Sequence, residues 1–162
     1  GGQSYQTSSL IYRREIREQQ PPQFLFSISG IGDYPLAILF ALSGKIRYMA
    51  EPMSVYRVSA QGSWSVRVQK NLNKIIDVQQ QTIKMLDMAD EYSGRRYHEI
   101  FQHAEHLQKY RLLQYQEQYR EMLKPEYNDC LMGLSTKDRM KLKIKAYFPF
   151  LIKVKRKLNH RG

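Results

Sequence analysis

Short apolar runs separated by polar turns occupy the first third of the chain and predict strands. Residues 5–14 place the apolar run at 10–12 behind a cluster of hydroxyl side chains. This pattern predicts a strand that ends in a polar turn. Residues 45–49 alternate with a period of two and predict a second strand, and residues 53–58 predict a third.

One apolar helix is predicted between these strands. Residues 36–42 are apolar on nearly every side, which is typical of a helix buried against other structure. Asp33 stands where a helix N-cap is expected, and Pro35 falls within the first turn. Gly44 then supplies a C-terminal stop signal.

The apolar period changes to that of a helix in the middle of the chain. Residues 66–92 predict one amphipathic helix, and Ser93-Gly94 predicts the turn that follows it. A second helix is expected from about residue 96 to residue 123, and Pro125 is expected to end it.

The chain has 162 residues and an apolar content of 42%, which suffices for one ordinary domain with a core. Its net charge of +11 is unevenly placed, because residues 134–162 contain ten Lys or Arg and one acidic residue, Asp138. From Thr136 onward these lysines alternate with large apolar residues. The segment is therefore either an interfacial element for an anionic membrane or a helix that packs on the domain with a solvated charged face.

Three kinds of side chain are candidates for chemistry. Asp33 is either a helix cap or a general base held near a helix N-terminus, where the ionised form is favoured. His98, His103 and His106 fall on the second predicted helix, and the last two lie one turn apart. That pair lacks a third ligand and a catalytic glutamate motif, so a solvated or boundary role is expected for these histidines and no metal is expected there. Cys130 has no local His or Asp arrangement that would activate it, so an inert thiol is expected, and a single cysteine fits a reducing compartment.

Three segments of the first half are similar to a known pattern. They are TSSLIYRREI at 7–16, GIGDYPLAILFALSGKIRYMAEPMSVYRV at 30–58 and GSWS at 62–65. These segments resemble the C-terminal half of the catalytic domain of bacterial family 2 glycosyltransferases, which have the GT-A fold. The resemblance covers residues 5–66, and its specificity lies in the order and spacing of the three parts.

The resemblance implies transfer of a sugar, with inversion, from a nucleotide-diphosphate sugar to an acceptor hydroxyl. In the family the aspartate before this helix is the general base, and that position here is Asp33. The hydroxyl residues near the start correspond to the acceptor side of the cleft, and the loop after the third predicted strand corresponds to a loop over donor and acceptor. The residues expected to bind donor or acceptor are Thr7, Ser8, Ser9, Gly32, Arg57, Ser63 and Trp64.

Two departures from the family pattern limit this expectation. A histidine that often follows the Tyr-Arg pair is replaced by Ser59 and Ala60. The sequence also contains no Asp-x-Asp motif, which in the complete enzyme would hold a Mg or Mn ion on the diphosphate. No metal ligand is therefore assigned to these residues, and we expect the chain to be a fragment that cannot transfer sugar alone.

The expected fold is α/β, a partial GT-A (Rossmann-like) sheet with a C-terminal helical extension. Residues 1–65 would form the acceptor-side half of the catalytic domain, residues 66–133 the helical extension and residues 134–162 a basic amphipathic tail. The alternative is a non-catalytic helical module that docks on a membrane or on a partner through its tail.

The expected partners of the complete enzyme are a nucleotide-diphosphate sugar and a glycan or glycolipid acceptor. Residues 136–162 would contact an anionic membrane surface, and unpaired sheet edges would favour self-association. Nucleic acid is not expected, because the +2 charge of the chain outside its tail provides no extended basic face. The expected location is cytoplasmic, peripheral on the inner face of the membrane.

Overall fold

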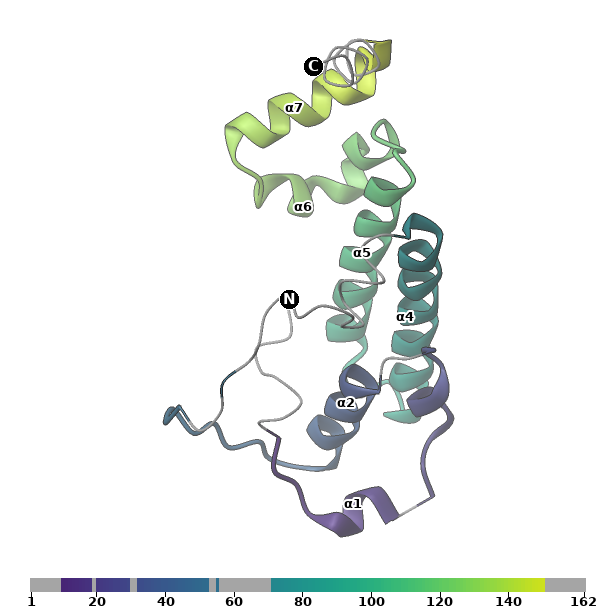
Figure 1. Cartoon of the computed structure of the whole chain (residues 1–162), viewed down its shortest axis with the longest axis vertical. Coiled ribbons are helices and arrows are strands. Elements are labelled where there is room, and N and C mark those ends of the chain that lie inside the picture. Colours follow the sequence, from purple (N-terminus) through teal and green to yellow (C-terminus); the bar gives the residue numbers. More distant parts are fainter. Residues whose placement is uncertain (1–9, 19, 30–31, 53–54, 56–70, 151–162) are drawn as a thin grey trace. The chain divides into compact units, whose positions relative to one another are not determined.

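The computed structural model describes residues 10–18, 20–29, 32–52, 55 and 71–150 (Figure 1). The regular structure of these residues is helical, and none of them lies in a β-strand. The chain divides into two compact units, residues 1–108 and residues 109–162. The boundary falls inside helix α5 (His98–Tyr115).

The predicted partial GT-A sheet is wrong for the residues that the structure describes. Residues 45–49 have no regular structure, and the Tyr48 side chain is 82% exposed. Leu10 to Arg13 are not a strand either, and helix α1 (Arg14–Glu18) follows them directly. The third predicted strand lies outside the described residues except for Val55, which is not in a strand.

The prediction failed because alternation of apolar and polar residues indicates only which side chains would lie on each face of a strand. It does not show that a partner strand is present. A strand must pair its backbone N–H and C=O groups with a neighbour, and an isolated strand is not stable in water. No described segment offers a pairing edge, so the apolar side chains at 46 and 48 remain in solvent. The described residues therefore contain no sheet edge of the kind on which the expected self-association was based.

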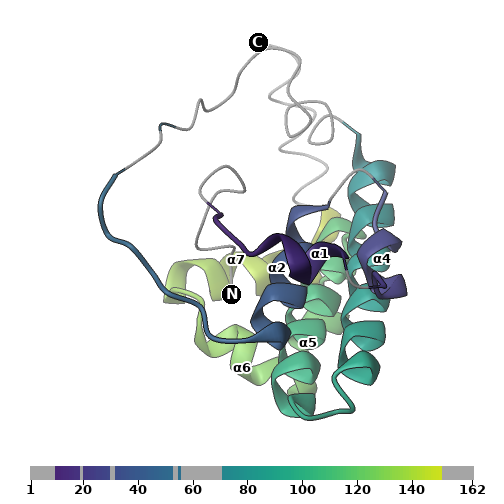
Figure 2. The ribbon, with the colours of Figure 1, turned by 90° about the horizontal axis from the view of Figure 1, so that it is seen from below.

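The first unit contains short and long helices in succession. They are α1, the 3₁₀ helix η2 (Gln23–Phe26), α2 (Asp33–Ser43), α4 (Leu72–Tyr92) and the part of α5 up to Gln108. Helix α4 and this part of α5 lie side by side (Figure 1 and Figure 2). The predicted helices at the positions of α2 and α4 are confirmed, although residues 66–70 of the second prediction lie outside the described residues.

The core of the first unit forms where η2, α2, α4 and α5 meet. Phe24 of η2, Leu39 of α2 and Phe101 of α5 are buried in one cluster with the inner face of α4. That inner face repeats at helical spacing, as expected for an amphipathic helix. Its buried residues are Val78, Thr82, Met85, Leu86, Ala89 and Asp90.

The turn after α4 is the predicted one and has the geometry of a Schellman motif. Gly94 has φ of 64°, in the left-handed region. The Gly94 N–H donates to the Glu91 carbonyl at 2.9 Å, and the Arg95 N–H donates to the Asp90 carbonyl at 3.0 Å. These bonds satisfy carbonyls that the end of a helix would leave without partners.

Replacing Gly94 with alanine is expected to lower the free energy of unfolding by about 1 kcal/mol, because a Cβ is strained at positive φ. No steric contribution is expected, since the added Cβ would meet no atom within 4 Å. The matched control is Gly133→Ala, where φ is −71° and the nearest atom, the Cys130 carbonyl oxygen, is 3.5 Å away. Urea unfolding measures both, and equal losses in the two variants would contradict the assigned turn.

The second unit contains the end of α5 and a series of shorter helices. They are η3 (Glu121–Leu123), η4 (Pro125–Tyr127), α6 (Asn128–Met132) and α7 (Thr136–Tyr147). Its core consists of Tyr110, Met122, Tyr127 and Leu142. The prediction of one helix to residue 123 is wrong, because α5 ends at Tyr115 and Pro125 opens η4.

Helix α5 ends early because its C-terminal turn closes on itself. Glu117 has φ of 56°, and the Gln118 N–H donates to the Leu113 carbonyl at 2.9 Å. This is the same type of closure as at Gly94, built on a residue with a side chain. A glycine would have signalled the turn in the sequence, whereas a glutamate does not.

Candidate functional site

The N-terminus of α2 holds the one predicted catalytic residue, Asp33. Gly32 occupies the N-cap position and Asp33 is the first helical residue, so the predicted cap is displaced by one position. Asp33 is half-buried, and its Oδ1 accepts a hydrogen bond from the Tyr34 N–H at 3.0 Å. The carboxylate therefore satisfies one of the first-turn donors that a helix leaves free.

The local sequence explains why the helix starts here. Pro35 lies in the first turn, where its missing N–H has no cost and its fixed φ suits a helix, and its ring is fully buried. Pro35, Ala37 and Leu39 are the buried residues of α2, and Phe40 contacts Tyr12 with ring centroids 4.4 Å apart. Packing of the helix body thus fixes the position of Asp33 at its end.

The surroundings of Asp33 suit a group that meets a ligand. The N-terminus of a helix presents backbone N–H donors and a partial positive charge, which attract polar and anionic ligand groups. Gly32 is exposed, and a Cβ placed on it would meet no atom within 4 Å. Gly32 therefore places no side chain next to Asp33.

Among the other predicted binding residues, the structure describes Gly32. Gly32 is the neighbour of Asp33 in the chain. The remaining six lie outside the described residues: Thr7, Ser8, Ser9, Arg57, Ser63 and Trp64. The structure therefore brings together Gly32 and Asp33 alone among the described members of the predicted site.

An acid–base pair that the sequence did not reveal joins α4 to α5. Asp90 is buried in the last turn of α4, and its Oδ2 lies 2.6 Å from Nδ1 of His98, the first residue of α5. The His98 side chain is 40% exposed, so its ring reaches from the buried carboxylate to the surface. Oδ1 of Asp90 is buried and has no hydrogen-bond partner among the described residues.

This pair fixes the orientation of the imidazole and links the two helices across the Gly94 turn. The eight-residue separation between Asp90 and His98 is not a single-helix spacing, so no sequence motif marks it. The other two histidines of α5 are placed differently, with His103 exposed and His106 half-buried. His98, for which the sequence predicted a solvated or boundary role, therefore has a specific buried partner, Asp90.

Cys130 of α6 is a half-buried thiol whose environment keeps it protonated. Burial and the neighbouring Asp129 raise the pKa of the Cys130 thiol to about 11. Since the thiolate is the nucleophile, this group is unreactive near neutral pH, in line with the inert thiol expected from the sequence.

Alkylation of Cys130 by iodoacetamide at pH 8 is expected to be about 100-fold slower in the folded chain than in the urea-unfolded chain. The reason is that a thiol with a pKa of about 11 contains far less thiolate at that pH than an ordinary one. The folded-state rate should rise about tenfold per pH unit until the pH approaches that pKa. Equal rates for folded and unfolded chains would contradict the raised pKa.

No helix among the described residues is both long and apolar enough to cross a membrane. Comparison of the chain with protein-family models, curated proteins and solved structures yields no match. The resemblance to family 2 glycosyltransferases therefore stays a prediction.

Proposed function

We propose that this chain carries the acceptor-side part of an inverting glycosyltransferase and that Asp33 is its general base. One observation carries the proposal: Asp33 is the first residue of an apolar helix, the position that the resemblance gives to the base. Its half-buried carboxylate accepts a hydrogen bond from the Tyr34 N–H, and the exposed Gly32 precedes it.

In the proposed reaction the Asp33 carboxylate takes the proton of the acceptor hydroxyl as the hydroxyl oxygen attacks the anomeric carbon of the donor sugar. A new C–O bond forms, and the bond from that carbon to the nucleoside diphosphate breaks. The bonding electron pair leaves with the diphosphate. A base held at a fixed position accelerates such a step by about 10²–10⁴-fold.

The nucleotide and any divalent metal would be held by a donor-binding half. The Asp-x-Asp motif that would hold a metal is not in this sequence, so a metal on the diphosphate would be bound by the donor-binding half. Residues 1–162 alone are therefore expected to give no turnover. The proposed location is the cytoplasm, with the enzyme peripheral on the inner face of the membrane, where a glycolipid acceptor is accessible.

The proposal is tested by fusing residues 1–162 behind the nucleotide-binding half of a family 2 glycosyltransferase that has lost its own acceptor half. Calorimetry first establishes that the fusion binds a nucleoside diphosphate. The fusion is then incubated with a panel of nucleotide-diphosphate sugars and with glycan and lipid-linked acceptors. We expect transfer of at least one sugar, with none by residues 1–162 alone.

Two outcomes would overturn the proposal. A folded, nucleotide-binding fusion that transfers no sugar from any donor would show that this chain does not supply an acceptor side. Turnover by residues 1–162 alone would show that the division between a donor half and this chain is wrong.

A further inference from the structure

Helix α7 is strongly basic and has one face packed on its own unit. It contains five Lys or Arg against the single Asp138. Leu142 and Ala146 are its buried residues, and Leu142 belongs to the core cluster with Tyr110 and Met122. The Arg120 Nε donates to the Ala146 carbonyl oxygen at 3.1 Å. These contacts fix which face of α7 points away from the core.

The outward face carries an apolar stripe. Successive helical residues are rotated by about 100°, so Met140, Ile144 and Tyr147 fall on one line opposite Leu142. All three side chains are between 40% and 60% exposed. Phe148 and Phe150 follow directly, are exposed to a similar extent, and contact each other edge to face with ring centroids 6.2 Å apart. A contiguous exposed apolar patch of this kind marks an interaction surface.

The cations of α7 divide into two groups. Arg139 and Lys145 hold the helix on its unit, since Arg139 Nη2 donates to the Met132 carbonyl at 2.9 Å and Lys145 Nζ lies 4.9 Å from the centre of the Tyr119 ring. The other three cations are exposed and border the apolar stripe, with one on one side and two on the other, and one of them, Lys141, is also paired with Asp138 of the same helix. They are Lys137, Lys141 and Lys143.

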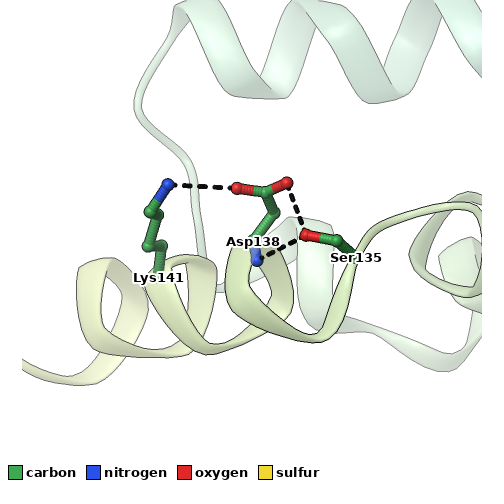
Figure 3. Close-up of polar contacts among 3 residues, drawn as sticks. All are labelled: Ser135, Asp138 and Lys141. Carbon is green, nitrogen blue, oxygen red and sulfur yellow. Dashed lines mark hydrogen bonds and ion pairs between the residues drawn. The ribbon is translucent and has the colours of Figure 1, made fainter.

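The N-terminus of α7 is also held by contacts within the chain itself. Ser135 Oγ accepts a hydrogen bond from the Asp138 N–H at 3.1 Å and donates one to Asp138 Oδ2 at 2.7 Å (Figure 3). Lys141 Nζ lies 3.2 Å from Asp138 Oδ1. The Ser135 hydrogen bond, and then Lys141, lower the pKa of the Asp138 carboxyl, so this first-turn carboxylate is ionised at neutral pH. The docking face is therefore preformed.

We propose that the outward face of α7, together with Phe148 and Phe150, docks on the surface of an anionic phospholipid bilayer. An apolar stripe flanked by lysines on both sides matches such a surface, because the apolar side chains enter the boundary between head groups and acyl chains. The lysines extend to the lipid phosphates. Nucleic acid would pair with the lysines but would leave the stripe in water. The inference uses a different surface from Asp33 and does not rest on the proposed function.

The test is co-sedimentation of the full chain with vesicles of phosphatidylcholine alone and of phosphatidylcholine mixed with phosphatidylglycerol. We expect binding to the mixed vesicles and little to the neutral ones. The variant Lys137→Gln/Lys141→Gln/Lys143→Gln is expected to bind the mixed vesicles about 100-fold more weakly. The matched control Lys74→Gln/Lys84→Gln/Lys124→Gln removes three exposed lysines elsewhere and should bind as the wild type does.

A second variant separates a lipid surface from a purely electrostatic partner. Met140→Ser/Ile144→Ser keeps every charge and is expected to weaken binding to mixed vesicles about tenfold or more, because it removes apolar side chains that enter the bilayer. Circular dichroism checks that each variant is folded. Equal losses in both lysine variants, unchanged binding of the serine variant, or binding to duplex DNA without binding to vesicles would each overturn the proposal.

Discussion

Replacing Asp33 with asparagine in the fused enzyme is expected to lower kcat for sugar transfer by about 10²–10⁴-fold. The asparagine side-chain oxygen can still accept the hydrogen bond from the Tyr34 N–H, which Asp33 accepts at 3.0 Å. It cannot take a proton from the acceptor hydroxyl. The KM for the donor should change little, because donor contacts belong to the other half. Steady-state kinetics with varied donor concentration measures both constants.

Asp77→Asn is the matched control for this variant. Asp77 is an exposed carboxylate on α4 that accepts a hydrogen bond from Gln81 Nε2 at 2.9 Å, so the same chemical change there should leave kcat unaltered. If Asp33→Asn retained a kcat close to that of the wild type, Asp33 would be a helix-terminal residue and another group would be the base.

Replacing Met85 with alanine is expected to destabilise the first unit by about 2–5 kcal/mol. The Met85 side chain is 0% exposed and lies in one cluster with Phe24, Leu86 and Phe101, so its removal leaves a cavity between η2, α4 and α5. The measurement is urea unfolding followed by far-ultraviolet circular dichroism, with the wild-type chain as reference.

Met49→Ala supplies the control within the same unit. Met49 is 43% exposed in a segment without regular structure, so its truncation should change the free energy of unfolding by at most about 0.5 kcal/mol. Similar small losses for both variants would mean that Met85 is not in a packed core, and the arrangement of the first unit would be wrong.

Helices with local start and stop signals could be predicted from the sequence. The Gly-Asp-Tyr-Pro run and the apolar residues after it predicted α2, and Ser93-Gly94 predicted the end of α4. In each case the signal is a backbone requirement of one residue, so no knowledge of distant contacts was needed. The early end of α5 has no such signal, since Glu117 adopts a positive φ that its residue type disfavours.

The predicted strands failed because their stability depends on partners that a period of two does not identify. Residues 45–49 show the right alternation, yet no described segment pairs with them and their apolar side chains face solvent. The tail illustrates the converse. Two interpretations were open for it. The structure shows that Leu142 and Ala146 pack inward while Met140, Ile144 and Tyr147 are exposed, and contact of this segment with a membrane stays a prediction.

The candidate site was predictable only where chemistry coincides with a helix terminus. Asp33 satisfies that condition, and the structure moves the start of its helix by a single residue. The Asp90–His98 pair was not predictable, because its 2.6 Å contact requires the relative placement of two helices across a turn. The sequence shows only that Asp90 belongs to a predicted helix, which is a weak signal for a contact with His98.

The most direct test of the central claim, inverting sugar transfer with Asp33 as base, is the anomeric configuration of the product made by the fused enzyme. Nuclear magnetic resonance of the transferred sugar distinguishes the two anomers. A single displacement at the anomeric carbon predicts the configuration opposite to that of the donor, formed by the wild type and lost in Asp33→Asn. A product with the donor configuration, or one formed equally well without the Asp33 carboxylate, would contradict the account.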